Sequence, residues 1–223
     1  MSMNDQSGVS IPKARTRRAI FAPHWGAILA LIAIGVLYAL LPQNVNGGPA
    51  WLLLTIEGVI LLPVLISILT GHRFSLTTRR IGSLVLLGVV TLAMSVAVLH
   101  LIFTLKHDLN GATLLYTGLL LYACNTLVFS LWYWAVDGGG ADERLLSEHR
   151  AFDFLFPQQM GGFDAVWIPG YFDYLYVAFT GATAFSPTDT MPLTHRAKFL
   201  MMAEAFLALL LISFVVSRAI NII

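Results

Sequence analysis

The sequence predicts an all-α integral membrane protein with five transmembrane helices and a short re-entrant, pore-like helix, and three observations support this fold class. The chain of 223 residues is 57% hydrophobic and only 11% charged, and its mean hydropathy of +0.78 exceeds that of soluble domains. Its apolar residues form runs of about 20, the length that crosses a hydrocarbon core of about 30 Å. Tryptophans stand near the ends of these runs, where their rings can rest among lipid headgroups.

The predicted elements follow one another along most of the chain. Residues 1–20 form a basic tail, and residues 21–136 hold four transmembrane helices, at about 22–41, 50–69, 81–105 and 112–136. Three consecutive glycines, Gly138 to Gly140, are expected to end the fourth helix, because glycine readily adopts the left-handed conformation. Residues 137–168 are expected to form a polar and aromatic connecting loop.

The last unit, residues 169–223, carries the main functional signal. Aromatic and apolar residues recur at helical spacing over 171–185, and a last span follows at about 199–220. Between them, four oxygen-bearing side chains occur within five residues, 186–190, and irregular backbone at membrane depth survives only inside protein or beside water. We therefore expect a dipping helix and an ion-facing turn, with these residues on the ion path: Thr183, Ser186, Thr188 and Asp189.

This unit resembles the pore module of potassium channels, which has an outer helix, a pore helix, a filter strand and an inner helix. The signature Thr-Thr-Val-Gly-Tyr-Gly-Asp of that family falls without a gap on residues 183–189, with identities at Thr183 and Asp189 and with Pro192 and Thr194 in register. The resemblance implies a homo-oligomer whose loops enclose an ion path. The whole chain is also similar to an uncharacterised family of bacterial predicted membrane proteins, which implies no activity.

The turn departs from a potassium filter at three positions. Both glycine positions hold residues with a Cβ atom, Ser186 and Thr188, and Pro187 fixes φ and removes a donor. The sequence therefore predicts a wider mouth for a partly hydrated monovalent cation instead of a potassium-selective carbonyl ladder. The same residues also make a good helix start, and Thr194 can cap the last helix. A capped turn in a non-conducting structural or accessory protein remains the alternative.

The basic residues predict a cytoplasmic amino terminus in a bacterial inner membrane. With five spans, all but two of the 13 Lys and Arg residues lie on the cytoplasmic side, and Lys106 and Arg218 lie outside. The chain then ends outside, which is opposite to a potassium-channel module. A full crossing by residues 166–185 would instead give six transmembrane helices, a cytoplasmic end and no re-entrant loop.

Four further polar residues are expected within the bilayer, where a charged side chain costs about 2.5 to 3.5 kcal/mol on insertion scales. They are Glu57 in the second span, His100 late in the third, Asn125 in the fourth and Glu204 early in the last. For Glu57 we expect either an interhelical hydrogen bond or a role as a proton site. The second case would make the protein a proton-coupled transporter, which is the third candidate function. Glu204 lies about a turn and a half past Lys198, so we expect an intrahelical ion pair with Lys198 or an interfacial ion pair for it, and no role in transport.

Other classes of function lack their sequence signals. The six histidines show no metal-binding spacing, Cys124 is the only cysteine, and no nucleotide loop or nucleophile elbow occurs. No basic stripe could follow a row of phosphates. The sequence therefore predicts no catalytic residues, no metal site, no cofactor and no nucleic-acid partner. The expected partners are the lipid bilayer, a monovalent cation and further copies of the chain.

Overall fold

The computed structural model describes residues 25–42, 76–104, 111–146, 152–160, 167–183 and 189–222, and most of these residues are helical. The predicted second span, with Glu57, lies outside the described residues. So do Ser186 and Thr188 of the predicted ion path.

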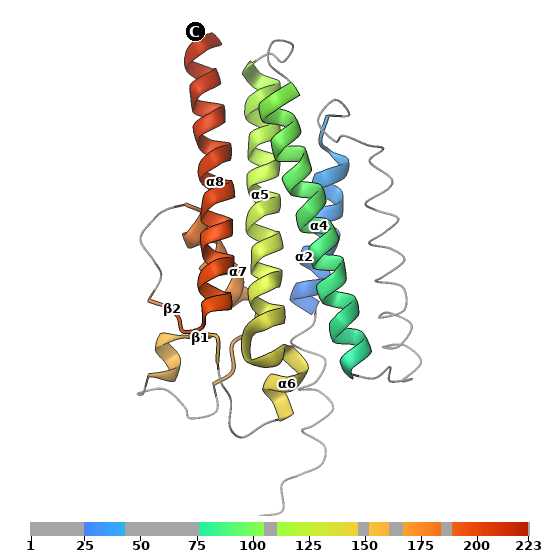
Figure 1. Cartoon of the computed structure of the whole chain (residues 1–223), viewed down its shortest axis with the longest axis vertical. Helices are drawn as coiled ribbons and strands as arrows, with labels where there is room; N and C mark the ends of the chain where they lie inside the picture. Colours follow the sequence, from blue (N-terminus) through green and yellow to red (C-terminus); the bar gives the residue numbers. More distant parts are fainter. Residues whose placement is uncertain are drawn as a thin grey trace, which may run out of the picture.

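Three long helices run side by side (Figure 1): α4 (Leu76–Thr104), α5 (Gly111–Val136) and α8 (His195–Ile222). Each contains a segment long and apolar enough to cross a membrane, namely Arg80–Phe103, Gly111–Gly139 and His195–Arg218. The third, fourth and last predicted spans are therefore confirmed as candidate membrane-spanning helices. A shorter apolar helix, α2 (Trp25–Ala39), lies within the first predicted span.

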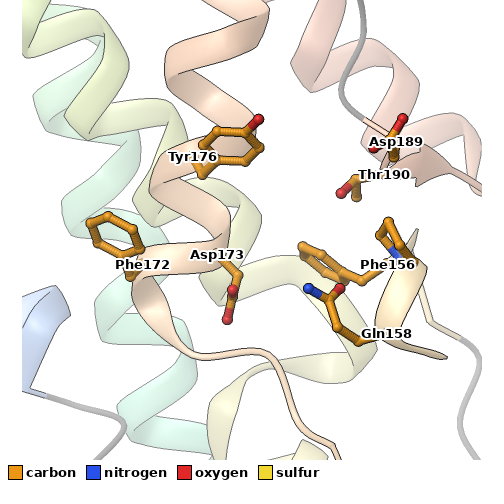
Figure 2. Close-up of a pocket in the computed structure, with 8 residues that line it drawn as sticks. Phe156, Gln158, Phe172, Asp173, Tyr176, Asp189 and Thr190 are labelled. Atoms are coloured by element: carbon orange, nitrogen blue, oxygen red, sulfur yellow. The ribbon is translucent and has the colours of Figure 1, made fainter. Parts of the chain in front are cut away.

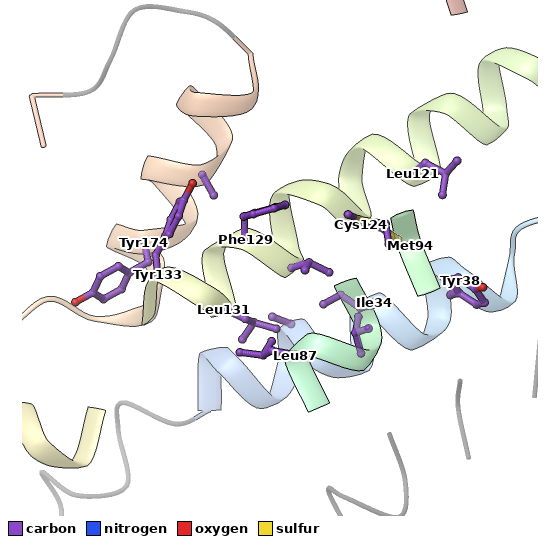
Figure 3. Close-up of a cluster of buried hydrophobic side chains, with 14 of the residues drawn as sticks. Ile34, Tyr38, Leu87, Met94, Leu121, Cys124, Phe129, Leu131, Tyr133 and Tyr174 are labelled. Atoms are coloured by element: carbon purple, nitrogen blue, oxygen red, sulfur yellow. The ribbon is translucent and has the colours of Figure 1, made fainter. Parts of the chain in front are cut away.

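Helix α5 lies at the centre of the bundle and packs against α2, α4, α8 and the short helix α7 (Tyr171–Ala182). Its apolar side chains pack with those of α2 and α4 in one core, and Figure 3 shows Leu131 of α5 beside Leu87 of α4. Helix α8 contributes less to this core and exposes a long apolar face that includes Phe199, Phe206 and Leu209. A central helix surrounded by neighbours can hold polar side chains, such as that of Asn125, away from lipid.

The predicted glycine termination of α5 is confirmed. A 3₁₀ turn over Asp137–Gly139 follows Val136, and Gly138, Gly139 and Gly140 have φ values of 57°, 84° and 105°. Such backbone is accessible to glycine without steric cost. The chain then forms the short helix α6 (Ala141–Leu146), so the predicted connecting loop contains regular structure.

The segments on either side of α7 lie at the same end of the bundle (Figure 1). Strand β1 (Phe154–Leu155) precedes α7 and pairs antiparallel with β2 (Met191–Pro192), which follows it. A 3₁₀ turn, Pro157–Gln159, lies just after β1. β2 leads directly into α8. The paired strands therefore hold the place where the chain returns after α7 beside the start of α8, and we call this place the return point.

Candidate functional site

A buried carboxylate, that of Asp153, anchors this return point. It accepts two hydrogen bonds from the guanidinium of Arg196, from Nε at 2.6 Å and from Nη2 at 2.8 Å, and one from the Thr194 hydroxyl at 2.5 Å. The backbone N–H of Gly138 donates a hydrogen bond to the Oδ2 atom of Asp153 at 3.2 Å. Thr194 also accepts a hydrogen bond from the N–H of Ala197 at 3.3 Å, which confirms the predicted cap of α8.

A second buried carboxylate, that of Asp137, joins the end of α5 to α7. One of its oxygens accepts hydrogen bonds from the N–H groups of Asp153, at 2.7 Å, and Phe154, at 3.1 Å. The other accepts the hydroxyl of Tyr174. Burial raises the pKa of Tyr174 above its usual value, so the phenol keeps its proton and acts as the donor. Asp137 and Asp153 together fix where α7 begins and where the chain returns. We call these two residues with Arg196, Tyr174 and Thr194 the clamp.

Arg144 closes the turn behind the clamp. Its Nη1 atom donates to the carbonyl oxygens of Asp137, at 2.6 Å, and Trp134, at 2.9 Å. The guanidinium also lies 5.1 Å from the centre of the Tyr174 ring, within the range of a cation–π contact. The otherwise orphaned carbonyl groups at the end of α5 are therefore satisfied by this side chain.

Two of the predicted ion-path residues, Thr183 and Asp189, lie within the described chain, and they have different surroundings. Thr183 lies at the end of α7, where its hydroxyl donates to the carbonyl oxygens of Phe179, at 2.9 Å, and Thr180, at 3.2 Å. Asp189 lies beside β2, where it is exposed and lines an open pocket of about 230 Å³. Figure 2 shows Asp189 across this pocket from Asp173 of α7. The described structure thus places Thr183 and Asp189 on either side of the undescribed residues 184–188.

Glu204 occupies the interior of the bundle, where α5, α7 and α8 meet. Its side chain is only 1% exposed, and the hydroxyl of Tyr133 donates a hydrogen bond to its Oε2 atom. The predicted ion pair with Lys198 is wrong, because Lys198 is exposed while Glu204 turns towards α5. Six residues along an α-helix place two side chains about 120° apart around the axis, on different faces.

Asn125 lies opposite Glu204 on α5 and is fully buried. Its Nδ2 atom donates to the backbone carbonyl of Glu204 at 3.3 Å. Its Oδ1 atom and the Oε1 atom of Glu204 have no hydrogen-bond partner among the described residues. Two acceptor oxygens without donors in an apolar interior are costly, and such atoms call for an explanation.

The end of α7 lies directly against Glu204. A Cβ atom built on Gly181 would stand 3.2 Å from the Oε2 atom of Glu204, so the last turn of α7 and the carboxyl group are in close contact. The carboxyl-terminal end of a helix carries a partial negative charge, which favours a cation nearby. The arrangement can therefore attract a cation or hold a proton. Among the described residues there is no group of three His, Cys, Asp or Glu side chains that could hold a metal ion.

Comparisons with protein-family models, curated proteins and solved structures found no match. Asn125 and Glu204 are among the predicted intramembrane residues, whereas Tyr133 and the network of the clamp carry no prediction beyond the cap at Thr194. A weak signal existed for the clamp, because Asp137 follows a long apolar run directly and Asp153 stands between two phenylalanines. Acidic residues in such surroundings need partners, although the sequence does not say which ones.

Proposed function

We propose that this protein passes a monovalent cation through a membrane along the segment that begins with α7 and ends at the start of α8. The observation that carries the proposal is the pairing of β1 with β2, which ties both ends of this segment to one end of the bundle. Helix α7 has 12 residues, so it is about 18 Å long and too short to cross a core of about 30 Å. A short helix between tied ends is the geometry of a re-entrant loop.

The charges at the tied end support an orientation. Arg144 and Arg196 belong to the network there, and Lys198 follows one turn into α8. Basic residues accumulate on the cytoplasmic side of bacterial membrane proteins. In this proposal the segment opens towards the cytoplasm, the protein has five spans in the inner membrane, and the chain ends outside. Several copies would enclose the path, as in other pore-loop proteins.

A second candidate function is a non-conducting structural or accessory membrane protein, in which the same segment is a capped turn. Two observations favour it: the Thr183 hydroxyl is engaged by its own helix, and Thr194 caps α8. Under this alternative the clamp serves stability alone. A proton-coupled transporter based on Glu57 lacks comparable support, because Glu57 lies outside the described residues.

Thiol labelling tests the arrangement of spans. In a Cys124→Ala background, single cysteines would replace Glu143, which is exposed, and Ile223 at the end of the chain. Five spans place the two thiols on opposite sides of the membrane, so a membrane-impermeant maleimide added outside cells should label only the cysteine at 223. Labelling of both positions from one side would show six spans and contradict a re-entrant α7.

Ion flux in liposomes tests passage. Wild-type protein should dissipate gradients of Na⁺ or K⁺, and Asp189→Ala and Ser186→Ala should reduce the rate, because both remove oxygens expected along the path. Glu143→Ala, at an exposed position of α6, is the matched control and should conduct like wild type. Absence of flux in wild-type protein under Na⁺, K⁺ and H⁺ gradients would favour the structural alternative.

A further inference from the structure

Two of the buried oxygens that have no hydrogen-bond partner among the described residues, Glu204 Oε1 and Asn125 Oδ1, belong to residues that contact each other. We infer that these two residues form a cation site inside the bundle, at which a monovalent cation and a proton compete for the Glu204 carboxylate. The inference rests on the proposed function in that the re-entrant segment would bring the cation to this depth. It goes further by naming the residues and the chemistry of exchange.

The burial of Glu204 requires a partner of positive charge. A carboxylate in an apolar interior is strongly disfavoured unless it is paired or protonated. Glu204 lies 1% exposed in the contact between α5, α7 and α8, and its described side-chain hydrogen-bond partner is the hydroxyl of Tyr133. In this inference the carboxyl group therefore carries either a proton or a bound cation.

The titratable groups around Glu204 are few. From α5 it meets the phenol of Tyr133, and Tyr122 is close enough to interact with it electrostatically. The facing last turns of α7, residues 177–183, contain no titratable side chain. On α8 itself the nearest charged residue is the exposed Lys198. Helix α4 also touches α8, but its described titratable side chains, Arg80 and His100, lie near its two ends. Glu204 is thus the group at this site that can exchange a proton.

The donor set favours a monovalent cation. Carboxylate and amide oxygens are hard ligands that suit Na⁺, K⁺ or Li⁺, and the negative end of α7 adds to the attraction. A divalent ion would need six to eight oxygen ligands, usually from several carboxylates, and Glu204 is the single carboxylate of this site. Binding would proceed as an exchange: the carboxyl O–H bond breaks, the proton leaves to water, and the cation takes its place beside the carboxylate. The charge of the site stays the same.

Tyr133 and Gly181 position the carboxyl group. The Tyr133 hydroxyl holds Oε2, so Oε1, which has no described hydrogen-bond partner, is left for the ligand. Gly181 allows α7 to approach, because a Cβ atom there would stand only 3.2 Å from Oε2. Gly181→Ala should therefore weaken cation binding several-fold without removing any ligand.

Proton release tests the exchange directly. The full-length chain in detergent, in weak buffer with a pH-indicator dye, would be titrated with NaCl, KCl or LiCl, and with choline chloride as the control for ionic strength. Wild-type protein should release up to one proton per chain in a saturable way, and the apparent affinity should fall up to tenfold for each unit that the pH is lowered. Glu204→Gln should release none, and the exposed Glu143→Gln should match wild type.

Two results would overturn the inference. One is the absence of saturable proton release from wild-type protein with all three cations. The other is release from folded Glu204→Gln equal to that of wild type. If Glu204→Gln fails to fold, Asn125→Ala and Tyr133→Phe, which keep the carboxyl group, should each shift the midpoint of the titration at least threefold. Unchanged midpoints in both variants would also contradict the site.

The same samples separate this inference from the proposed function. Saturable proton release without ion flux in liposomes would support the cation site and contradict the proposal that the protein passes ions. Ion flux that persists in Glu204→Gln, together with no proton release from wild-type protein, would support ion passage and contradict the cation site at Glu204. The ion path would then run elsewhere, along the segment that carries Asp189.

Discussion

The guanidinium of Arg196 binds both carboxylate oxygens of Asp153, at 2.6 and 2.8 Å, and so joins the first turn of α8 to the strand that precedes α7. Asp153 is fully buried, while about half of the Arg196 side chain is exposed, so the arginine covers the carboxylate on the water side. The backbone supports the same link, because the N–H of Leu193 donates to the carbonyl of Asp153 at 2.8 Å. Bidentate pairs of this kind combine strength with a fixed direction.

Removing this pair should loosen the return point of the chain. We expect Arg196→Ala to lower the free energy of unfolding by roughly 1 to 2 kcal/mol, because hydrogen bonds to a charged group are lost but the exposed arginine is partly screened by water. The stability of Arg196→Lys should lie between those of wild-type protein and Arg196→Ala, because lysine keeps the positive charge but lacks the planar guanidinium that binds two oxygens at once. Thermal unfolding can be followed through the reaction of a fluorogenic maleimide with Cys124, the buried and only thiol.

The exposed Lys198, two residues further along α8, supplies the control. Lys198→Ala should leave the unfolding temperature close to that of wild type. Equal losses for Arg196→Ala and Lys198→Ala would show that the clamp contributes no specific stability.

A side chain at Gly139 should destabilise the glycine turn after α5. Its φ of 84° lies in the left-handed region, and a Cβ atom there would stand 3.3 Å from the Cβ and Cγ atoms of Glu143. Gly139→Ala should cost roughly 1 to 2 kcal/mol. Gly82, inside α4, has nothing within 4 Å of its would-be Cβ atom, so Gly82→Ala should be neutral or stabilising by up to about 1 kcal/mol. Thermal unfolding that ranks the two variants in the opposite order would contradict this account.

The long helices could be predicted from the sequence because their signal accumulates over about 20 residues. The spans around α4, α5 and α8 needed only apolar length, and their observed ends differ from the predicted ones by a few residues. Local chemistry also predicted two termini, the glycine stop after Val136 and the cap at Thr194. Such signals need no knowledge of what packs against the helix.

The contacts that build the site could not be predicted in this way. The hydrogen bond from Tyr133 to Glu204 joins residues 71 positions apart, and it depends on how α5 and α8 are rotated against each other. The sequence paired Glu204 with Lys198 because they are near in sequence, although the two point to different faces of the helix. The clamp likewise depends on where the chain returns after α7, and residues 137–168 carry no periodic pattern that sets this point.

Close packing of α5 against α8 should depend on Gly118. A Cβ atom at this position would stand 2.5 Å from the Cγ2 atom of Val215, closer than two carbon atoms can approach. Small residues at such contacts let helix backbones come together in membranes. Gly118→Ala should therefore lower the unfolding temperature by forcing α8 outward.

A double variant separates this clash from other effects of the mutation. Gly118→Ala combined with Val215→Ala should recover most of the lost stability, because the two changes occupy and vacate the same space. Purely additive losses in thermal unfolding, measured with Cys124 as the probe, would rule out the contact as the cause.

Tyr171 should make the protein sensitive to alkaline pH. Its hydroxyl lies 2.6 Å from that of Ser130 on α5, and its side chain packs against Gly26 of α2. Burial raises the pKa of Tyr171 to about 12, although the hydrogen bond with Ser130 lowers it somewhat. In the unfolded chain the phenol ionises near pH 10. The stability that depends on the neutral phenol is therefore fully present below pH 10 and is lost as the pH rises towards 12.

Tyr171→Phe removes this ionisation and provides the comparison. At pH 8 the variant should be less stable than wild type by about 1 kcal/mol, because the hydrogen bond with Ser130 is lost. Between pH 10 and pH 12, wild-type protein should lose about 2 to 3 kcal/mol more than the variant, which follows from a shift of about two pKa units. Denaturant unfolding monitored by tryptophan fluorescence at several pH values measures both effects. Parallel pH profiles would mean that the Tyr171 phenol reaches water in the folded protein.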